Sequence, residues 1–147
     1  MPDQETTVGE LRDKWRKFVS DRDWNRFHSA KNLSMAIAAE AAELVELFLW
    51  VEGPESNDMA RGERLAATRD EVADIAGALL AFCNAMDIDL SDAIANKMAK
   101  NERKYPANTF RGRWRLNAPS EPGVGSLRDS SNPAPNAGDG DPVLEET

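Results

Sequence analysis

Two pairs of acidic residues at helical spacing are the part of this sequence best suited to chemistry. Glu40, Glu43 and Glu46 are the only charged residues in the largely apolar run 33–51. Glu40 and Glu43 are three positions apart, and Glu71 and Asp74 repeat that spacing in the next apolar segment. Residues at i and i+3 project from the same side of a helix. Because an ionised carboxylate is costly to remove from water without compensation, we expect these helices to bury the acids around a cation.

The type of ligand indicates which cation. Carboxylate oxygens are hard ligands, and the chain has only one histidine and one cysteine. This composition favours Mg²⁺, with Mn²⁺ as a substitute, over zinc. A di-iron centre would add a histidine three residues after its glutamates, which neither pair has. The alternative is that the acids form an exposed stripe or pair with Lys and Arg of a neighbour.

A second polar group follows further along the chain. Lys97, Asn101 and Lys104 lie at i, i+4 and i+7, so a helix over this segment presents them on one face. Two ammonium groups and an amide suit the oxygens of a phosphate that Mg²⁺ also contacts. An ordinary solvated helix face explains the same pattern.

Aromatic residues supply the third ingredient. Trp24 and Phe27 lie with His28 in the aperiodic segment 21–29, and Trp50 lies near the end of the apolar run. Their rings can stack on a flat base, although each ring taken singly is more often a core or interface residue. Together with a metal site and a phosphate-binding face, they indicate a nucleotide ligand.

Four helices should position these residues, which predicts an all-α fold resembling a four-helix bundle. The first should begin at Thr7, where Glu10 completes a capping box, and end near Arg22. The others should run from Ser29 or Asn32 to about Val51, from about Glu63 to Met86, and from Asp89 or Ser91 to before Pro106. The second and third should pack antiparallel, joined by a polar, mobile connection over 52–62. Residues 1–117 should form this domain and residues 118–147 a disordered acidic tail.

Composition narrows the possible functions. The net charge of −8 argues against binding to a nucleic-acid polymer. No signal peptide or membrane span is evident, which predicts a cytoplasmic protein without a membrane partner. Cys83 should be a buried small apolar residue. The long apolar faces of the second and third helices make an isolated monomer doubtful and predict a homo-oligomer.

With these residues in place, the chain resembles the all-α nucleoside triphosphate pyrophosphatases of the MazG-like superfamily, especially the dCTP pyrophosphatase branch. The resemblance covers about residues 11–106. Four segments carry it, namely RDWNRFHSAKNL (22–33), EAAELVELFLW (40–50), DEVAD (70–74) and KMAKNERKYP (97–106).

The resemblance implies Mg²⁺-dependent hydrolysis of a (deoxy)nucleoside triphosphate, such as dCTP or a modified pyrimidine nucleotide, to the monophosphate and pyrophosphate. It also implies a homodimer or homotetramer in which one subunit completes the pocket of another. By the same similarity, the metal ligands would be Glu40, Glu43, Glu71 and Asp74. The phosphates would contact Lys97, Asn101, Lys104 and Tyr105, and the base would lie among Trp24, His28 and Trp50.

One position departs from that pattern. Relatives in this branch often carry tyrosine four residues after the last metal-binding acid, where this chain has Ala78. The base or sugar end of the pocket should therefore be larger or differently built. A dUTP-type or broad-specificity enzyme is the alternative within the same class, and a non-enzymatic nucleotide-sensing or dimerisation module is the alternative outside it.

Overall fold

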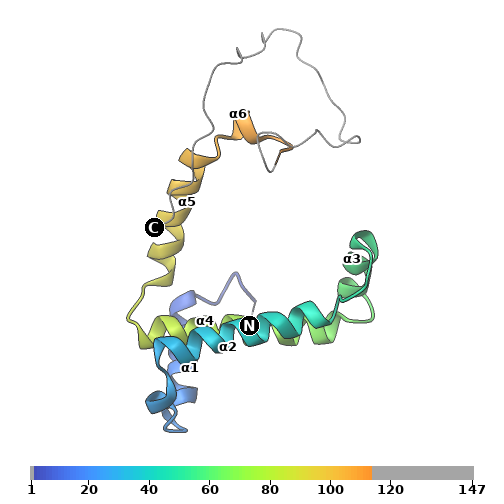
Figure 1. Ribbon diagram of the computed structural model, residues 1–147. Helices are drawn as coiled ribbons and strands as arrows, with labels where there is room; N and C mark the ends of the chain where they lie inside the picture. Colours follow the sequence, from blue (N-terminus) through green and yellow to red (C-terminus); the bar gives the residue numbers. More distant parts are fainter. Residues whose placement is uncertain (1, 114–147) are drawn as a thin grey trace, which may run out of the picture. The chain divides into compact units, whose positions relative to one another are not determined.

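The computed structural model describes residues 2–113, and all regular structure in that range is helical (Figure 1). The elements are α1 (Val8–Ser20), the 3₁₀ turn η1 (Asn25–Phe27), α2 (Ala30–Glu46), α3 (Gly53–Arg61), α4 (Leu65–Ala85), α5 (Leu90–Lys104) and α6 (Ala107–Phe110). This confirms the all-α prediction. The chain divides into two compact units, the first ending at Lys104 and the second beginning at Tyr105. The predicted boundary at residue 117 and the tail 118–147 lie outside the described residues.

Helix α1 begins where the capping pattern predicts. The amide of Glu10 donates to Thr7 Oγ1 at 3.2 Å, and the amide of Thr7 donates to Glu10 Oε2 at 2.7 Å. These reciprocal bonds satisfy two amides that have no partner inside the helix. The backbone bond from Thr7 is the main reason that the pKa of Glu10 lies below its ordinary value.

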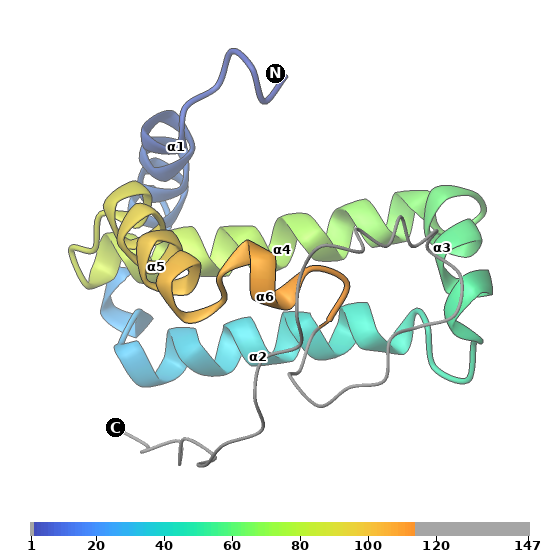
Figure 2. The same cartoon turned by 90° about the horizontal axis from the view of Figure 1, so that it is seen from above.

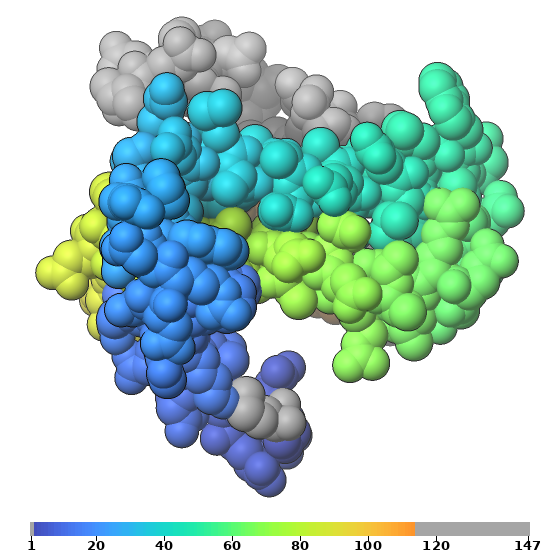
Figure 3. Space-filling model, turned by 90° about the horizontal axis from the view of Figure 1, so that it is seen from below, coloured from blue at the N-terminus to red at the C-terminus, as the bar shows by residue number. Residues whose placement is uncertain are grey.

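Helices α2 and α4 lie side by side and run in opposite directions, as predicted (Figures 1 and 2). Ser29 caps α2 by accepting a hydrogen bond from the amide of Asn32 at 3.2 Å. Helix α1 packs against α4 near the opposite end from α3, which packs against α4 as well. In the space-filling view, α1 and the segment after it extend across one end of the α2–α4 pair (Figure 3).

The connection between α2 and α4 differs from the prediction. Helix α2 ends at Glu46 rather than near Val51, and a turn over 47–50 brings Trp50 into the left-handed region with φ of 65°. The predicted mobile connection over 52–62 is also wrong, because it contains α3. Pro54 explains part of this result, since proline fits the first turn of a helix, where its missing amide would have no partner.

The buried core is small and lies at the junction of α1, α2 and α4. Its buried apolar residues in the described chain are Val19, Leu33, Leu80, Ala81 and Cys83, so the prediction for Cys83 is confirmed. Large apolar side chains elsewhere on α2 and α4 are exposed, including Met35 at 62%, Val45 at 59% and Val72 at 50%. The two helices therefore leave part of their apolar surface uncovered within one chain.

Helix α5 begins after Asp89, one of the two expected caps. The amide of Asp92 donates to Asp89 Oδ1 at 3.0 Å, and the helix ends at Lys104, before Pro106. In the second unit, the ring of Tyr105 meets that of Phe110 edge to face, with centroids 5.2 Å apart. None of the helices among residues 2–113 combines the length and the apolar character needed to cross a bilayer.

Candidate active site

Three of the predicted metal-binding acids converge. Glu40 and Glu43 on α2 and Glu71 on α4 each offer a carboxylate oxygen, and the three oxygens lie within 4.8 Å of one another. Their positions follow from the helical spacing on α2 and from the antiparallel pairing of α2 with α4. We call these residues the acid cluster. Asp74 is one turn further along α4 and is not part of it.

The surroundings of Glu71 disfavour its ionised form. Burial raises the pKa of Glu71, and the charges of Glu43, Asp74, Glu40 and Asp70 raise it further. Its Oε2 atom is shielded from solvent and has no hydrogen-bond partner among the described residues. A shielded carboxylate oxygen without a partner is costly in a folded protein. The donor set is all oxygen, which fits a hard divalent cation such as Mg²⁺ or Mn²⁺.

The expected deep burial of the acids is wrong for the chain described here. Glu40 and Glu71 are half-buried, whereas Glu43 and Asp74 are exposed. The reason is that, among residues 2–113, α2 packs mainly on α4. The apolar residues around the acids are therefore partly exposed themselves.

A cavity of about 240 Å³ lies between α1, the segment after it, α2 and α4. We call it the aromatic cavity. Its lining consists of Trp15, Phe18, Val19, Trp24, His28, Leu33, Ala36, Glu40, Asp74, Gly77, Ala78 and Ala81. Two of the predicted base-binding residues, Trp24 and His28, are among them. Glu40 belongs to both the acid cluster and the aromatic cavity, which therefore adjoin.

The aromatic side chains of this cavity form a connected series. The ring centroids of Trp15 and Phe18 are 5.4 Å apart and those of Phe18 and Trp24 are 5.8 Å apart, in both cases edge to face. The guanidinium carbon of Arg22 lies 3.6 Å from the Phe18 ring centroid, and its Nη1 donates to the Phe18 carbonyl oxygen at 3.0 Å. Such cation–π and edge contacts hold flat side chains in defined orientations.

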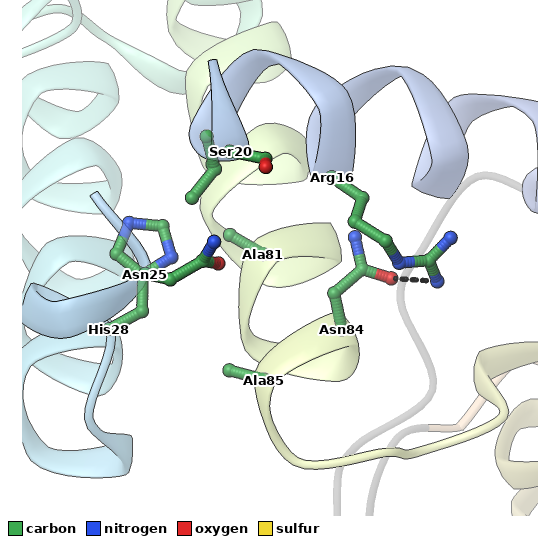
Figure 4. Close-up of a pocket in the computed structure, with 8 residues that line it drawn as sticks. Arg16, Ser20, Asn25, His28, Ala81, Asn84 and Ala85 are labelled. Atoms are coloured by element: carbon green, nitrogen blue, oxygen red, sulfur yellow. Dashed lines mark hydrogen bonds between the residues drawn. The ribbon is translucent and has the colours of Figure 1, made fainter. Parts of the chain in front are cut away.

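A second, more polar cavity of about 300 Å³ adjoins the same loop (Figure 4). His28 lines both cavities, and Arg16, Ser20, Asn25 and Asn84 supply most of the polar groups of this one. The dashed bond in Figure 4 is donated by Arg16 Nη2 to Asn84 Oδ1 at 3.2 Å. This bond joins α1 to α4, the two helices that carry much of the aromatic cavity.

The remaining predicted residues lie elsewhere in the described chain. Trp50 is 99% exposed and borders an open apolar groove with Phe48, Leu49 and other residues, outside the aromatic cavity. Lys97, Asn101 and Lys104 are exposed along α5 and do not line the aromatic cavity, and Tyr105 belongs to the second unit. Their proposed contacts with substrate stay predictions.

Sequence reasoning missed several residues that the structure places at the cavity. No role in the site was predicted for Trp15, Phe18 or Gly77, yet all three line the aromatic cavity. A glycine inside a helix was the available signal, because such a residue often marks the close approach of another group. The identity of that group depends on tertiary packing.

Comparisons with known proteins agree with this architecture. Residues 35–113 match the MazG-like family. The chain is 37% identical over 109 residues to dCTP pyrophosphatase 1 of Bos taurus, covering 74% of this chain and 64% of that protein. The corresponding protein of Homo sapiens is 35% identical over 108 residues, covering 73% of this chain and 64% of that protein. The chain therefore spans less than two thirds of the length of these curated relatives.

A solved structure is similar to this chain over nearly the whole length of the solved protein. The crystal structure of a pyrophosphatase from Archaeoglobus fulgidus matches with a TM-score of 0.65 and 35% sequence identity, covering 72% of this chain and 98% of that chain. The sequence match, the curated relatives and the shared helical fold lead to one conclusion. The chain belongs to the MazG-like family.

Proposed function

We propose that the protein hydrolyses a (deoxy)nucleoside triphosphate, preferentially dCTP or a modified pyrimidine nucleotide, to the monophosphate and pyrophosphate. The position of Glu40 supports this proposal most strongly, because it places a carboxylate of the acid cluster in the wall of the aromatic cavity. A ligand with its base in that cavity would have its phosphates close to the acids. The dCTP pyrophosphatase names of the relatives point to the same substrate class.

The size of the aromatic cavity supports binding of the base inside it and of the triphosphate outside it. Pockets that enclose a whole drug-sized ligand are roughly 300–1,000 Å³, whereas this cavity is about 240 Å³. It can accept a base but not a complete triphosphate. Trp24 would stack on the base and His28 would donate to or accept from its edge.

Glu40, Glu43 and Glu71 would hold Mg²⁺, and Asp74 would join them from the next turn of α4. When bound, the ion would neutralise phosphate oxygens and lower the pKa of a water molecule. The shielded Oε2 atom of Glu71 is the observation that fits this ion best, because a bound cation would supply the missing partner.

The protein side chains would complete the reaction. Glu43 is exposed and central among the acids of α2, so its carboxylate oxygen that does not hold the ion would accept a proton from the attacking water. The water oxygen would attack the α-phosphorus in line, and the bond from that phosphorus to the oxygen bridging the α- and β-phosphates would break. The lysines of α5 would stabilise the departing pyrophosphate. The nucleoside monophosphate would keep its base in the aromatic cavity until it dissociates.

Self-association belongs to the same proposal. Trp50, Met35, Val45 and Val72 are all at least half exposed. Burying these side chains against a second copy would remove a large apolar area from water. A homodimer or homotetramer could then bring Trp50 and the α5 lysines of one subunit to the acids of another.

The test is pyrophosphate release from dCTP, dUTP, dTTP, dATP and 5-methyl-dCTP at increasing Mg²⁺ concentration. Glu43→Gln and Asp74→Asn should each lower kcat by roughly 10²-fold or more, as expected for the loss of a general base or a ligand group. Glu63→Gln, at an exposed site between α3 and α4, is the matched control and should be unaffected. Unchanged turnover in both site variants would refute the proposed roles, and binding without turnover by the wild-type protein would indicate a sensing module.

A further inference from the structure

Gly77 allows an unusually close contact between two helices. It lies buried inside α4, and a Cβ atom at this position would be 2.1 Å from Cζ2 of Trp15 and 2.7 Å from both Cε2 and Cη2. Distances this short are not tolerated between carbon atoms. Trp15 therefore lies directly on the backbone of α4, and it can do so because residue 77 has no side chain. Glycine is disfavoured inside helices, so its presence here is explained by this contact.

The contact forms part of a surface that a ligand can reach. Trp15 is only half-buried, and both Trp15 and Gly77 line the aromatic cavity together with Ala78. Residues 77 and 78 are therefore both small on the α4 side, whereas the large ring of Trp15 on α1 lies against Gly77. The free space of the cavity depends on how far that ring can approach α4.

We propose that Trp15, resting on Gly77, contacts the base of the nucleotide and that this pair determines the size of base admitted. The inference rests on the proposed function and adds to it a residue that selects the substrate. The indole of Trp15 offers a flat apolar surface and one N–H donor, both suited to a heterocyclic base. Trp15 is joined edge to face, through Phe18, to Trp24, so the series presents two indole rings to the cavity.

The experiment uses Trp15→Phe, Gly77→Ala and the double variant, with Gly9→Ala as the matched control. A Cβ atom on Gly9 would make only ordinary contact, 3.7 Å from Thr7 Oγ1. Two quantities are measured for each protein, namely the ratio of kcat/KM for dATP to that for dCTP and the ratio of the Kd values for dAMP and dCMP. Thermal unfolding of each variant reports separately on stability.

Trp15→Phe should enlarge the cavity and raise the purine-to-pyrimidine ratio by about tenfold, the size of effect expected when a pocket changes by a few carbon atoms. Gly77→Ala should force the indole towards the cavity and weaken dCMP binding by about tenfold. The double variant should recover dCMP binding, because a phenyl ring does not extend as far over residue 77. Gly9→Ala should leave both ratios at their wild-type values.

A purely structural role would change thermal stability but leave both ratios unaltered. The inference is therefore overturned if Trp15→Phe folds and its purine-to-pyrimidine ratios remain within about twofold of wild type. This variant decides the matter even if Gly77→Ala does not fold. Absence of pyrophosphate release by the wild-type protein would instead refute the proposed function, while the Kd ratios would still decide the role of Trp15.

Discussion

Replacing Asn84 by alanine should loosen α1 from α4 and thereby disturb the aromatic cavity. The Asn84 side chain makes three hydrogen bonds to α1. Its Oδ1 accepts from Arg12 Nε at 3.1 Å and from Arg16 Nη2 at 3.2 Å, and its Nδ2 donates to the Arg12 carbonyl oxygen at 2.9 Å. Arg12 and Asn84 are half-buried, whereas Arg16 is exposed.

These contacts determine the expected magnitude. A buried hydrogen bond contributes about 1 kcal/mol net and one to a charged group somewhat more, but the bond to exposed Arg16 contributes less. The free energy of unfolding should fall by about 2–3 kcal/mol. At roughly 3 °C per kcal/mol for a chain of this size, Tm should fall by about 6–9 °C.

The assay is thermal unfolding followed by far-UV circular dichroism at fixed protein concentration, so that self-association does not alter Tm between samples. Asn96→Ala is the matched control, because its Nδ2 makes one exposed bond of 2.9 Å to Asp92 within α5. Its effect should be about 0.5 kcal/mol or less. A double-mutant cycle with Arg12→Ala should give a coupling energy of about 1 kcal/mol.

Asn84→Ala should also have a kinetic effect. Because α1 carries Trp15 and Phe18 into the aromatic cavity, Asn84→Ala should raise KM for dCTP more than it lowers kcat. A stability loss no larger than that of Asn96→Ala, with no measurable coupling to Arg12, would refute the assignment of Asn84 as the link between α1 and α4.

Three further outcomes follow from single sites. In metal-free protein the raised pKa of Glu71 means that the folded state holds its proton more tightly, so stability should fall as pH rises above about 4. Saturating Mg²⁺ should reverse this fall in stability, and Glu71→Gln should remove it. The measurement is thermal unfolding across pH, and identical profiles with and without Mg²⁺ would count against cation binding by the acid cluster. Thr68→Val should stabilise the protein by about 1 kcal/mol in chemical denaturation, because Thr68 Oγ1 is buried without a partner, whereas Thr68→Ser should not. Thr7→Ala should lower stability by about 1 kcal/mol by removing the cap of α1, and no change in the denaturation midpoint would contradict that role.

Local sequence patterns correctly predicted the helix caps and the shared side of two acidic residues. The reciprocal bonds of Thr7 and Glu10 and the cap at Asp89 depend on residues three positions apart, so the chain encodes them without reference to the rest of the fold. The spacing of Glu40 and Glu43 likewise placed both on one side of α2. The antiparallel pairing of α2 and α4 then brought Glu71 to them.

Local patterns failed at the end of α2 and in the burial of the acids. The apolar run 33–51 reads as one helix, but the chain leaves the helix after Glu46 and continues through a turn into α3. The burial of the acids was also overestimated. Periodicity indicates which side of a helix is apolar, but it does not show whether a neighbouring element covers that side.

The sequence alone therefore determined the helical class, the capped start of α1, and the two acidic turns that we propose bind a cation. Only the tertiary structure placed Trp15 on Gly77, separated Trp50 from the aromatic cavity, and left the Oε2 atom of Glu71 shielded without a partner. The physical reason is the distance along the sequence between the residues that interact. Helix spacing and caps involve neighbours within one turn, whereas the shape of a cavity depends on side chains that meet only after α1, α2 and α4 have packed together.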